Sequence, residues 1–330
     1  MSDETHRSAS PDYTDWCATV RAHSALLDTT PDYAENRALV EETASAYERA
    51  HESGERRMAR EGVLDIPVVV HVVHSTDEQN ISEAQIRSQI DVLNRDFRKQ
   101  NPDVSNVPQV WRNIIGDARI GFHLAGTDPL GRPTNGITRT RTSVASFDAP
   151  DPSSPDPDKR TDNKVKFAQT GGQNAWPSDV YLNIWVCQLT RGLLGYAQFP
   201  GGPAATDGVV ITHKGFGTNG TAAAPFNGGR TTTHEIGHWL NLRHIWGNKQ
   251  GCAGDDLVAD TPNQEGPNFG TPAFPQVTCG NAPNGDMFMN YMDYTDDAAM
   301  FMFSAGQVAR MESTFENARR SFAARQLALA

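Results

Sequence analysis

The stretch that decides the fold is Thr233-His234-Glu235-Ile236-Gly237-His238-Trp239-Leu240-Asn241-Leu242-Arg243-His244. His234 and His238 are four residues apart, so a helix places both imidazoles on one face, where they can bind one Zn²⁺. If the helix ends near Asn241 and the chain turns back, His244 supplies a third nitrogen. Three protein ligands leave a fourth position open, as in catalytic rather than structural zinc sites. Glu235 adjoins the ligands, where it can take a proton from water.

The overall composition narrows the class of protein. The chain has 330 residues, of which 38% are hydrophobic and 21% charged, and its formal net charge is -11. This is typical of a globular chain of about two domains or subdomains. Nucleic acid is not an expected partner, because phosphate binding requires a basic face. No apolar stretch approaches the roughly 18 residues of a membrane helix, so no membrane partner is expected. The oligomeric state stays open.

The first 60 residues differ from the remainder. They contain no lysine and end in the basic stretch Glu55-Arg56-Arg57-Met58-Ala59-Arg60, which a protease can cut. A polar helix is expected over residues 31–60, with a disordered tail as the alternative. Residues 1–10 are polar and show no signal peptide. Either the chain is not exported by that route or a leader has been removed, and the sequence leaves both open.

Hydrophobic patterns predict the order of elements. Strands are expected over residues 63–74, 119–125, 180–188 and 207–213, with a short edge strand over 193–199. Helices are expected from Ser82, over 231–242, and as a single C-terminal helix from Ser304. Gln85 and Gln307 suggest a capping box at each serine. Residues 149–164 and 247–294 predict irregular chain. The order predicts an α+β fold with a mixed sheet.

The string from His234 to His244 resembles the metzincin metalloprotease signature H-E-x-x-H-x-x-G-x-x-H. Asn241 stands where the signature has glycine. That glycine allows a sharp turn with positive φ, and asparagine tolerates this backbone region next best, so the turn is expected to be kept. Extended to Gly247, the string ends in His-Ile-Trp-Gly and resembles the pappalysin (cytophagalysin) family of metzincins.

This resemblance implies a methionine turn beneath the zinc site, for which Asn290-Tyr291-Met292-Asp293-Tyr294 supplies Met292. Core packing of a methionine is the alternative. A family tyrosine two residues further matches Tyr294, whose phenol can stabilise an oxyanion. The implied α+β fold has a twisted mixed sheet, a backing helix and the zinc helix in an upper subdomain (61–244). An irregular lower subdomain with a C-terminal helix (245–330) completes it.

An oxygen-rich loop spans residues 254–264. Ca²⁺ prefers carboxylate and carbonyl oxygens, and the resemblance implies a calcium site there, with a solvated acidic loop as the alternative. The candidate ligands are Asp256, Asp260, Thr261 and Gln264. Cys252 and Cys279 flank the loop and match the family's disulfide.

Cys17 stands alone near the start of the chain. A thiolate is a good zinc ligand, and several metzincin zymogens keep a pro-segment cysteine on the zinc. The segment around residues 17–37 is similar to pappalysin pro-segments. Residues 1–60 are therefore expected to be a pro-segment, with Cys17 on the zinc in a latent form, and 61–330 the catalytic domain. An ordinary tail thiol is the alternative.

Together these features imply a secreted or extracellular zinc endopeptidase that acts on proteins or peptides. An extended substrate is expected to pair with the edge strand around Leu194, Gly195 and Tyr196. Asp297 is expected in the pocket for the residue after the scissile bond, where it would favour Arg or Lys; a solvated or calcium-bound aspartate is the alternative. A zinc exopeptidase and an idle zinc-binding module are the other classes. His244 argues against the first and Glu235 against the second.

Overall fold

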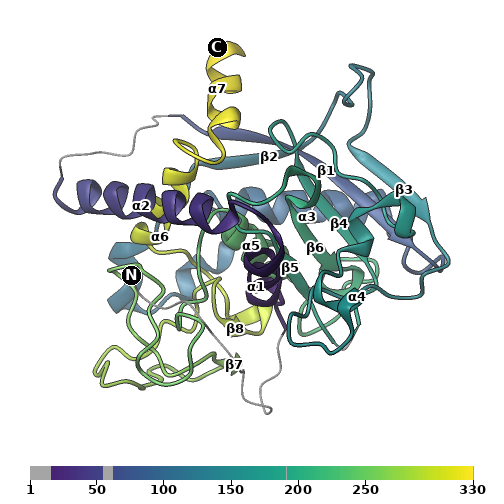
Figure 1. Cartoon of the computed structure of the whole chain (residues 1–330). Coiled ribbons are helices and arrows are strands. Elements are labelled where there is room, and N and C mark those ends of the chain that lie inside the picture. The colour runs from purple at the N-terminus through teal and green to yellow at the C-terminus, as the bar shows by residue number, and fades with distance from the viewer. Residues whose placement is uncertain (1–15, 55–61, 191, 330) are drawn as a thin grey trace.

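The computed structural model describes residues 16–54, 62–190 and 192–329 (Figure 1). The expected segment boundary at residue 60 and the basic stretch over 55–60 lie outside the described residues. Among those that are described, no helix has both the length and the hydropathy of a membrane span.

A six-stranded sheet forms the centre of the molecule. Its order is β2-β1-β4-β6-β5, with β3 also paired to β1. The strands are β1 (Leu64–His74), β2 (Ile120–Leu124), β3 (Ile137–Arg141), β4 (Leu182–Cys187), β5 (Gly195–Ala197) and β6 (Val209–Thr212). All pairs are parallel except β5 with β6. The predicted mixed sheet is confirmed and β5 is its edge strand. Sequence patterns miss β3, because its residues are mostly polar and none is buried.

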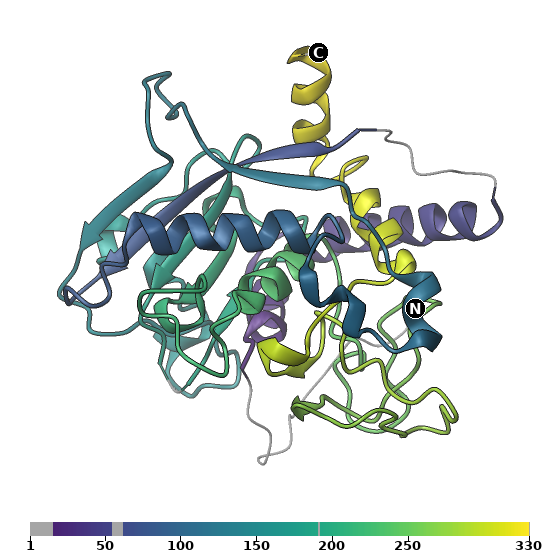
Figure 2. The same cartoon turned by 180° about the vertical axis from the view of Figure 1, so that it is seen from behind.

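Side chains alternate along each strand, so the two faces of the sheet have different neighbours. Val68 and the residues in phase with it face the main core, which helices α3 (Glu83–Asp96) and α5 (Arg230–Trp239) complete. Figure 2 shows α3 lying across this face. Trp185 and Tyr196 point to the opposite face, where loops cover them. The zinc motif therefore lies on a helix that packs directly on the sheet.

Ser82 caps α3 as predicted, because its hydroxyl accepts a hydrogen bond from the amide of Gln85 at 3.1 Å. The second half of the predicted capping box is wrong. The Gln85 side chain donates instead to the carbonyl oxygens of His213, at 3.1 Å, and Phe216, at 2.8 Å. It thereby ties the backing helix to the chain that follows β6.

The single C-terminal helix expected from Ser304 is wrong, since two helices are present: α6 (Ala305–Thr314) and α7 (Arg320–Leu329). The capping box predicted at Ser304 is complete. Between the two helices Arg319 turns inward and donates to both oxygens of Asp207, at 2.8 and 3.0 Å. The helix is therefore interrupted between Thr314 and Arg320, where this buried ion pair forms.

The N-terminal segment forms two helices that pack on the rest of the chain. Helix α1 (Thr19–Thr29) lies beside β5, and α2 (Tyr33–Glu52) lies beside α6 (Figure 1). The predicted polar helix is confirmed over the range of α2, whereas α1 is not predicted from its sequence. Residues 19–52 are thus helical and not a disordered tail.

The lower part of the molecule is irregular, as predicted. Its only sheet among the described residues pairs β7 (Phe269–Gly270) with β8 (Tyr294–Thr295). The disulfide between Cys252 and Cys279 is present, as the resemblance implied. The loop expected over 149–164 contains one helical turn, α4 (Pro157–Arg160). Short 3₁₀ turns lie at Pro102–Asn106, Gln109–Ile114, Lys164–Lys166, Ala168–Thr170, Ala204–Thr206, His213–Gly215 and Asp297–Ala299.

The end of α5 confirms the turn predicted at Asn241. Its φ is 74°, in the left-handed region. The amide of Leu242 donates to the carbonyl of Gly237, and that of Asn241 to His238, each at 2.9 Å. This is the pattern of a Schellman motif, which glycine usually completes. Both polar atoms of the Asn241 side chain are buried and have no hydrogen-bond partner among the described residues.

We expect Asn241→Gly to be at least as stable as the wild type. It keeps the left-handed turn and removes a buried amide whose lack of partners costs about 1–3 kcal/mol. Asn241→Ala is the matched control: it removes the same amide, but its Cβ disfavours the left-handed backbone by about 1–2 kcal/mol. Urea unfolding of the three proteins measures the difference. An alanine variant more stable than the glycine variant would contradict this account of the turn.

Candidate metal and catalytic site

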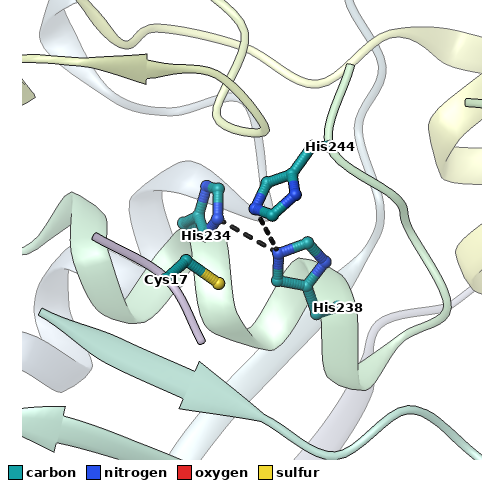
Figure 3. Close-up of side chains that lie close together, drawn as sticks. All are labelled: Cys17, His234, His238 and His244. Carbon is teal, nitrogen blue, oxygen red and sulfur yellow. Dashed lines mark hydrogen bonds between the residues drawn. The ribbon is translucent and has the colours of Figure 1, made fainter. Parts of the chain in front are cut away.

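Three imidazoles converge at one point beside β5 (Figure 3). His234 and His238 come from α5, and His244 comes from the chain after the turn. Nε2 of His238 lies 3.1 Å from Nε2 of His234 and 3.2 Å from Nε2 of His244. All three side chains are buried. The helical spacing and the turn at Asn241 bring the predicted ligands together.

Each imidazole is oriented by an acceptor at its other nitrogen. Nδ1 of His234 faces the carbonyl oxygen of Tyr291, and Nδ1 of His238 faces the carbonyl oxygen of Leu242. Nδ1 of His244 faces the side-chain oxygen of Asn248. The first two distances are 2.7 Å. An oxygen of this kind only accepts, so each neutral ring carries its proton on Nδ1. The three Nε2 lone pairs then face one another, as in metal sites whose ligands are fixed by outer hydrogen bonds.

The protonation state and the spacing of these rings both fit zinc. Burial lowers the pKa of His234 to about 4, and it lowers the pKa values of His238 and His244 well below the usual range. The rings are therefore neutral at pH 7, as metal ligation requires. Zinc–nitrogen bonds of about 2.0–2.1 Å in a tetrahedron place nitrogen ligands about 3.3 Å apart, close to the distances observed.

Cys17 of the N-terminal segment completes this cluster. Its sulfur and the imidazole nitrogens all lie within 4.8 Å of one another, and the thiol points toward the rings (Figure 3). Within the described part of the chain, no other group of three or more His, Cys, Asp or Glu side chains is arranged to hold a metal. Three nitrogens and one sulfur are a donor set that suits zinc.

Glu235 is buried beside the cluster and is contacted by the N-terminal segment. Its Oε2 accepts a hydrogen bond from the Thr19 hydroxyl at 2.9 Å and a longer one from the Cys17 thiol at 3.5 Å. Thr19 Oγ1 also accepts from the amide of Ala197 at 2.8 Å. Gly195 leaves room for the carboxylate, because a Cβ there would lie 2.9 Å from its Oε1. Thr19 is not among the site residues that the sequence predicts. In an extended segment, side chains two residues apart point to the same side, so Thr19 is expected to lie on the side of Cys17.

The segment around Cys17 lies along the edge strand, parallel to it. The amide of Leu194 donates to the carbonyl of Trp16 at 2.9 Å, and the carbonyl of Gly195 accepts from Ala18 at 3.0 Å. Leu194 and Gly195 thus face this segment through their backbones. The side chain of Tyr196, also predicted to contact substrate, points to the opposite face of the sheet.

The predicted methionine turn lies against the zinc helix. Met292 is buried, and its sulfur is so close to α5 that a Cβ added at Gly237 would lie 2.5 Å from it. The carbonyl of Met292 accepts from the amide of Ile245 at 3.2 Å. Since the preceding Tyr291 carbonyl orients His234, this turn contacts the chain on both sides of the cluster.

Tyr294 lies beside the imidazoles. Its ring meets that of His244 edge-on, with centroids 5.0 Å apart. Its hydroxyl donates to the carbonyl of Cys17 at 3.3 Å. The ring of Trp16 faces Tyr294 at 6.0 Å and meets Phe226 edge-on at 4.8 Å. Aromatic side chains therefore surround the N-terminal segment where it enters the site.

Asp297 lines the same cavity as His234 and Glu235. Its Oδ2 accepts hydrogen bonds from the backbone amides of Gly228, at 2.7 Å, and Arg230, at 3.2 Å. Burial raises the pKa of Asp297 to about 6. The carboxylate is thus built into the wall of the cavity rather than solvated at the surface.

A buried ion pair joins the zinc helix to the backing helix. The Arg230 guanidinium donates to one oxygen of Asp96 and, at 2.6 Å, to the hydroxyl of Tyr291. The Thr233 hydroxyl donates to the other oxygen of Asp96 at 2.7 Å. These hydrogen bonds connect α5, α3 and the methionine turn in one network. No local sequence pattern predicts these contacts.

The residues predicted to bind calcium have different partners. Asp256 accepts from the Thr261 hydroxyl at 2.9 Å, and burial raises the pKa of Asp256 to about 7. Asp260 instead accepts from the Ser304 hydroxyl at 2.6 Å and binds the start of α6. Gln264 donates through its nitrogen, while its Oε1 is buried without a hydrogen-bond partner among the described residues.

Comparison with known proteins agrees with this site. Residues 167–316 match the family model described as pregnancy-associated plasma protein-A. An extracellular metalloprotease of Pyricularia oryzae is 32% identical over 270 residues, which cover 79% of this chain and 78% of the relative. One from Verticillium alfalfae is 40% identical over 144 residues, 42% of this chain and 51% of the relative.

Two solved structures match the fold. A promirolysin mutant of Tannerella forsythia is 47% identical, with a TM-score of 0.80, and the match covers 93% of this chain and 96% of that one. Mature mirolysin of the same organism, in complex with a cleaved peptide, is 53% identical, with a TM-score of 0.74, covering 80% of this chain and 96% of that one. By its sequence, its fold and its relatives, the chain belongs to the pappalysin family of metzincin metallopeptidases.

Proposed function

We propose that the chain is the latent precursor of a secreted zinc endopeptidase, with residues 1–60 as pro-segment and 61–330 as catalytic domain. The observation that carries the proposal is the meeting of Cys17 with the three imidazoles at one point. The promirolysin match covers 93% of this chain and the mature mirolysin match 80%, which supports a removable segment. The names of the extracellular relatives support secretion.

In the active form, His234, His238 and His244 hold the zinc ion. A zinc ion there supplies Lewis acidity toward a substrate carbonyl and lowers the pKa of a water molecule. Glu235, which adjoins the ligands without being one, takes the proton of the attacking water and passes it to the leaving amine. The Tyr294 hydroxyl donates a hydrogen bond to the developing oxyanion.

In the latent form, the N-terminal segment occupies the places of both water and base. The sulfur of Cys17 would join the three imidazoles in holding a zinc ion. Thr19 holds the Oε2 of Glu235 at 2.9 Å. The same segment covers the backbone of Leu194 and Gly195, which an extended substrate would use by strand addition. Only the backbone of Tyr196 would contact a substrate bound in this way, because its side chain points to the opposite face of the sheet.

The specificity proposed for the cavity is Arg or Lys after the scissile bond. Near Asp297, the Arg230 guanidinium is bound by Asp96 and Asp103. Asp297 accepts from the backbone amide of Arg230 and adds its own charge near that guanidinium. Three carboxylates and one guanidinium leave an excess of negative charge, which favours a cationic side chain, with arginine preferred for its planar fork. Cleavage before Arg56, Arg57 or Arg60, which lie outside the described residues, would then cut the covalent link between the pro-segment and the catalytic domain.

The loop over residues 254–264 remains a predicted calcium site. The carboxylate of Asp256 and the buried Oε1 of Gln264 are the side-chain oxygens that support it. Thr261 contributes by orienting Asp256. Asp260 has a structural role of its own at the start of α6.

We expect Glu235→Ala, activated by an added protease, to lose peptide hydrolysis and to keep zinc. Loss of base catalysis should lower the rate at least about 10²- to 10⁴-fold. His238→Ala is the matched variant, which should lose zinc as well. Metal analysis and a peptide assay on both proteins measure this. Near wild-type hydrolysis by Glu235→Ala would refute the mechanism.

We expect Cys17→Ala in the full chain to be processed faster and to hydrolyse peptides before processing, because the fourth ligand position opens. Thr19→Val should add to this effect by releasing Glu235. Cys187→Ala, which alters a buried free thiol in β4, is the control and should process like the wild type. Time courses by gel and peptide assay compare them. Full activity of the uncut wild-type chain would exclude a pro-segment role.

We expect Asp297→Ala to lower kcat/KM for substrates with Arg after the scissile bond by about 10- to 100-fold, the loss of a charge-assisted contact. Hydrolysis of substrates with an apolar residue there should change little. Asp296→Ala, which removes a less buried neighbouring carboxylate, is the control. A cleaved peptide library read by mass spectrometry gives both values. An apolar preference that is the same in Asp297→Ala and the wild type would show that the pocket is assigned wrongly.

A further inference from the structure

Arg310 of α6 is a fully buried cation at the contact between α6 and α2. Its guanidinium pairs with Glu41, and with Glu48 at 3.2 Å, and both carboxylates belong to α2. Its Nε donates to the carbonyl of Asn241 at 2.9 Å. Among the described residues from 62 onward, no carboxylate forms an ion pair with it. Both carboxylates that form ion pairs with Arg310 thus lie on the N-terminal segment.

The carboxylates that reach Arg310 follow a helical pattern. Glu41 and Glu48 are seven residues apart, which is two turns of α2, so both lie on one face. Burial acts to raise the pKa of Glu41, but Arg310, Arg37 and Arg243 together lower it. Of these three cations, Arg310 and Arg243 belong to the part of the chain that stays after processing.

The surface under α2 also has polar groups along its length. The Asn317 side chain donates to the Thr43 hydroxyl at 2.9 Å, and the carbonyl of Gly201 accepts from Asn36 at 3.2 Å. Helix α1 follows Cys17 of the metal cluster directly in the chain, and a short turn over residues 30–32 joins it to α2. A chain bound in the cleft can therefore continue over this surface, as residues 17–52 do.

We propose that the surface left by α2 is an anion-binding exosite of the mature enzyme, centred on Arg310 and Arg243, which binds an acidic helix of a protein substrate with two carboxylates seven residues apart. This rests on the proposed function, in which residues 1–60 are removed. Removal of α2 takes both carboxylate partners away from the Arg310 guanidinium. A substrate helix with the charge pattern of α2 restores the ion pairs that processing removes.

The test uses wild-type enzyme activated from the full chain and three substrates with one cleavage sequence. The first is a short peptide. The second carries, on either side of the cleavage sequence, a helix with Glu at two positions seven apart, and the third carries the same helix with Gln. We expect kcat/KM for the Glu substrate to exceed that for the Gln substrate about tenfold, the value of a charge-assisted contact, through KM. Equal values for the two, with the short peptide cleaved normally, would overturn the exosite and leave the proposed function intact.

Enzyme variants locate the effect. Arg243→Gln should remove much of the preference for the Glu substrate and leave short-peptide hydrolysis unchanged. Arg310→Gln should remove the preference entirely. Because Arg310 also holds the turn at Asn241, the Arg243 variant and the substrate pair keep the test valid if Arg310→Gln folds poorly. Arg87→Gln, at an exposed arginine of α3, is the control. An undiminished preference in Arg243→Gln and Arg310→Gln would refute the location.

A direct binding measurement separates the exosite from the peptidase activity. A labelled peptide of residues 33–52 is titrated with the activated protein, beside the same peptide with Glu41→Gln and Glu48→Gln. We expect about tenfold weaker binding of the Gln peptide, and competition of the Glu peptide with the Glu substrate but not with the short peptide. Equal binding of both peptides, or equal inhibition of both substrates, would contradict the proposal whether or not the short peptide is cleaved.

Discussion

Imidazole lone pairs repel one another, and this protein brings three of them together. The Nε2 atoms of His234 and His244 lie 3.1 and 3.2 Å from Nε2 of His238. A cation among the three nitrogens turns this repulsion into attraction, so the folded chain is arranged in advance to bind a metal ion. Each ring is fixed by an acceptor from a different place: the methionine turn for His234, the end of α5 for His238 and Asn248 for His244. The turn that carries Met292 therefore orients one of the proposed metal ligands, His234, through the carbonyl of Tyr291.

A second set of contacts keeps those acceptors in place. Arg230 and Asp96 join the zinc helix to α3 and reach the hydroxyl of Tyr291, whose carbonyl orients His234. Arg310 holds the carbonyl of Asn241 in the turn that returns His244. Both arginines are buried, so loss of either one leaves polar groups uncompensated in the core. The spacing of the ligands thus depends on ion pairs that lie outside the motif.

The part of this site that the sequence predicts is the part that short-range geometry determines. His234, His238 and Glu235 follow from helical spacing, and Asn241 from its tolerance of the left-handed region. The contacts missed, such as Thr19 with Glu235 and Arg230 with Asp96, join residues more than 100 positions apart. The same reason explains the two wrong helix details, since Gln85 and Arg319 leave their local patterns for distant partners. The loop over residues 254–264, where a calcium site is predicted, has no regular ligand spacing, and its side chains have partners that the sequence does not reveal.

The contacts of the N-terminal segment also bear on how latency ends. Those described lie within residues 16–54, and they include contacts around Cys17 at the metal cluster and others around Glu41 on α2. The proposed cleavage stretch over 55–60 lies beyond both sets of contacts. A cut there breaks no described contact and leaves the segment bound without a covalent link. In the proposed precursor, activity therefore requires departure or digestion of residues 16–54 in addition to the cut itself.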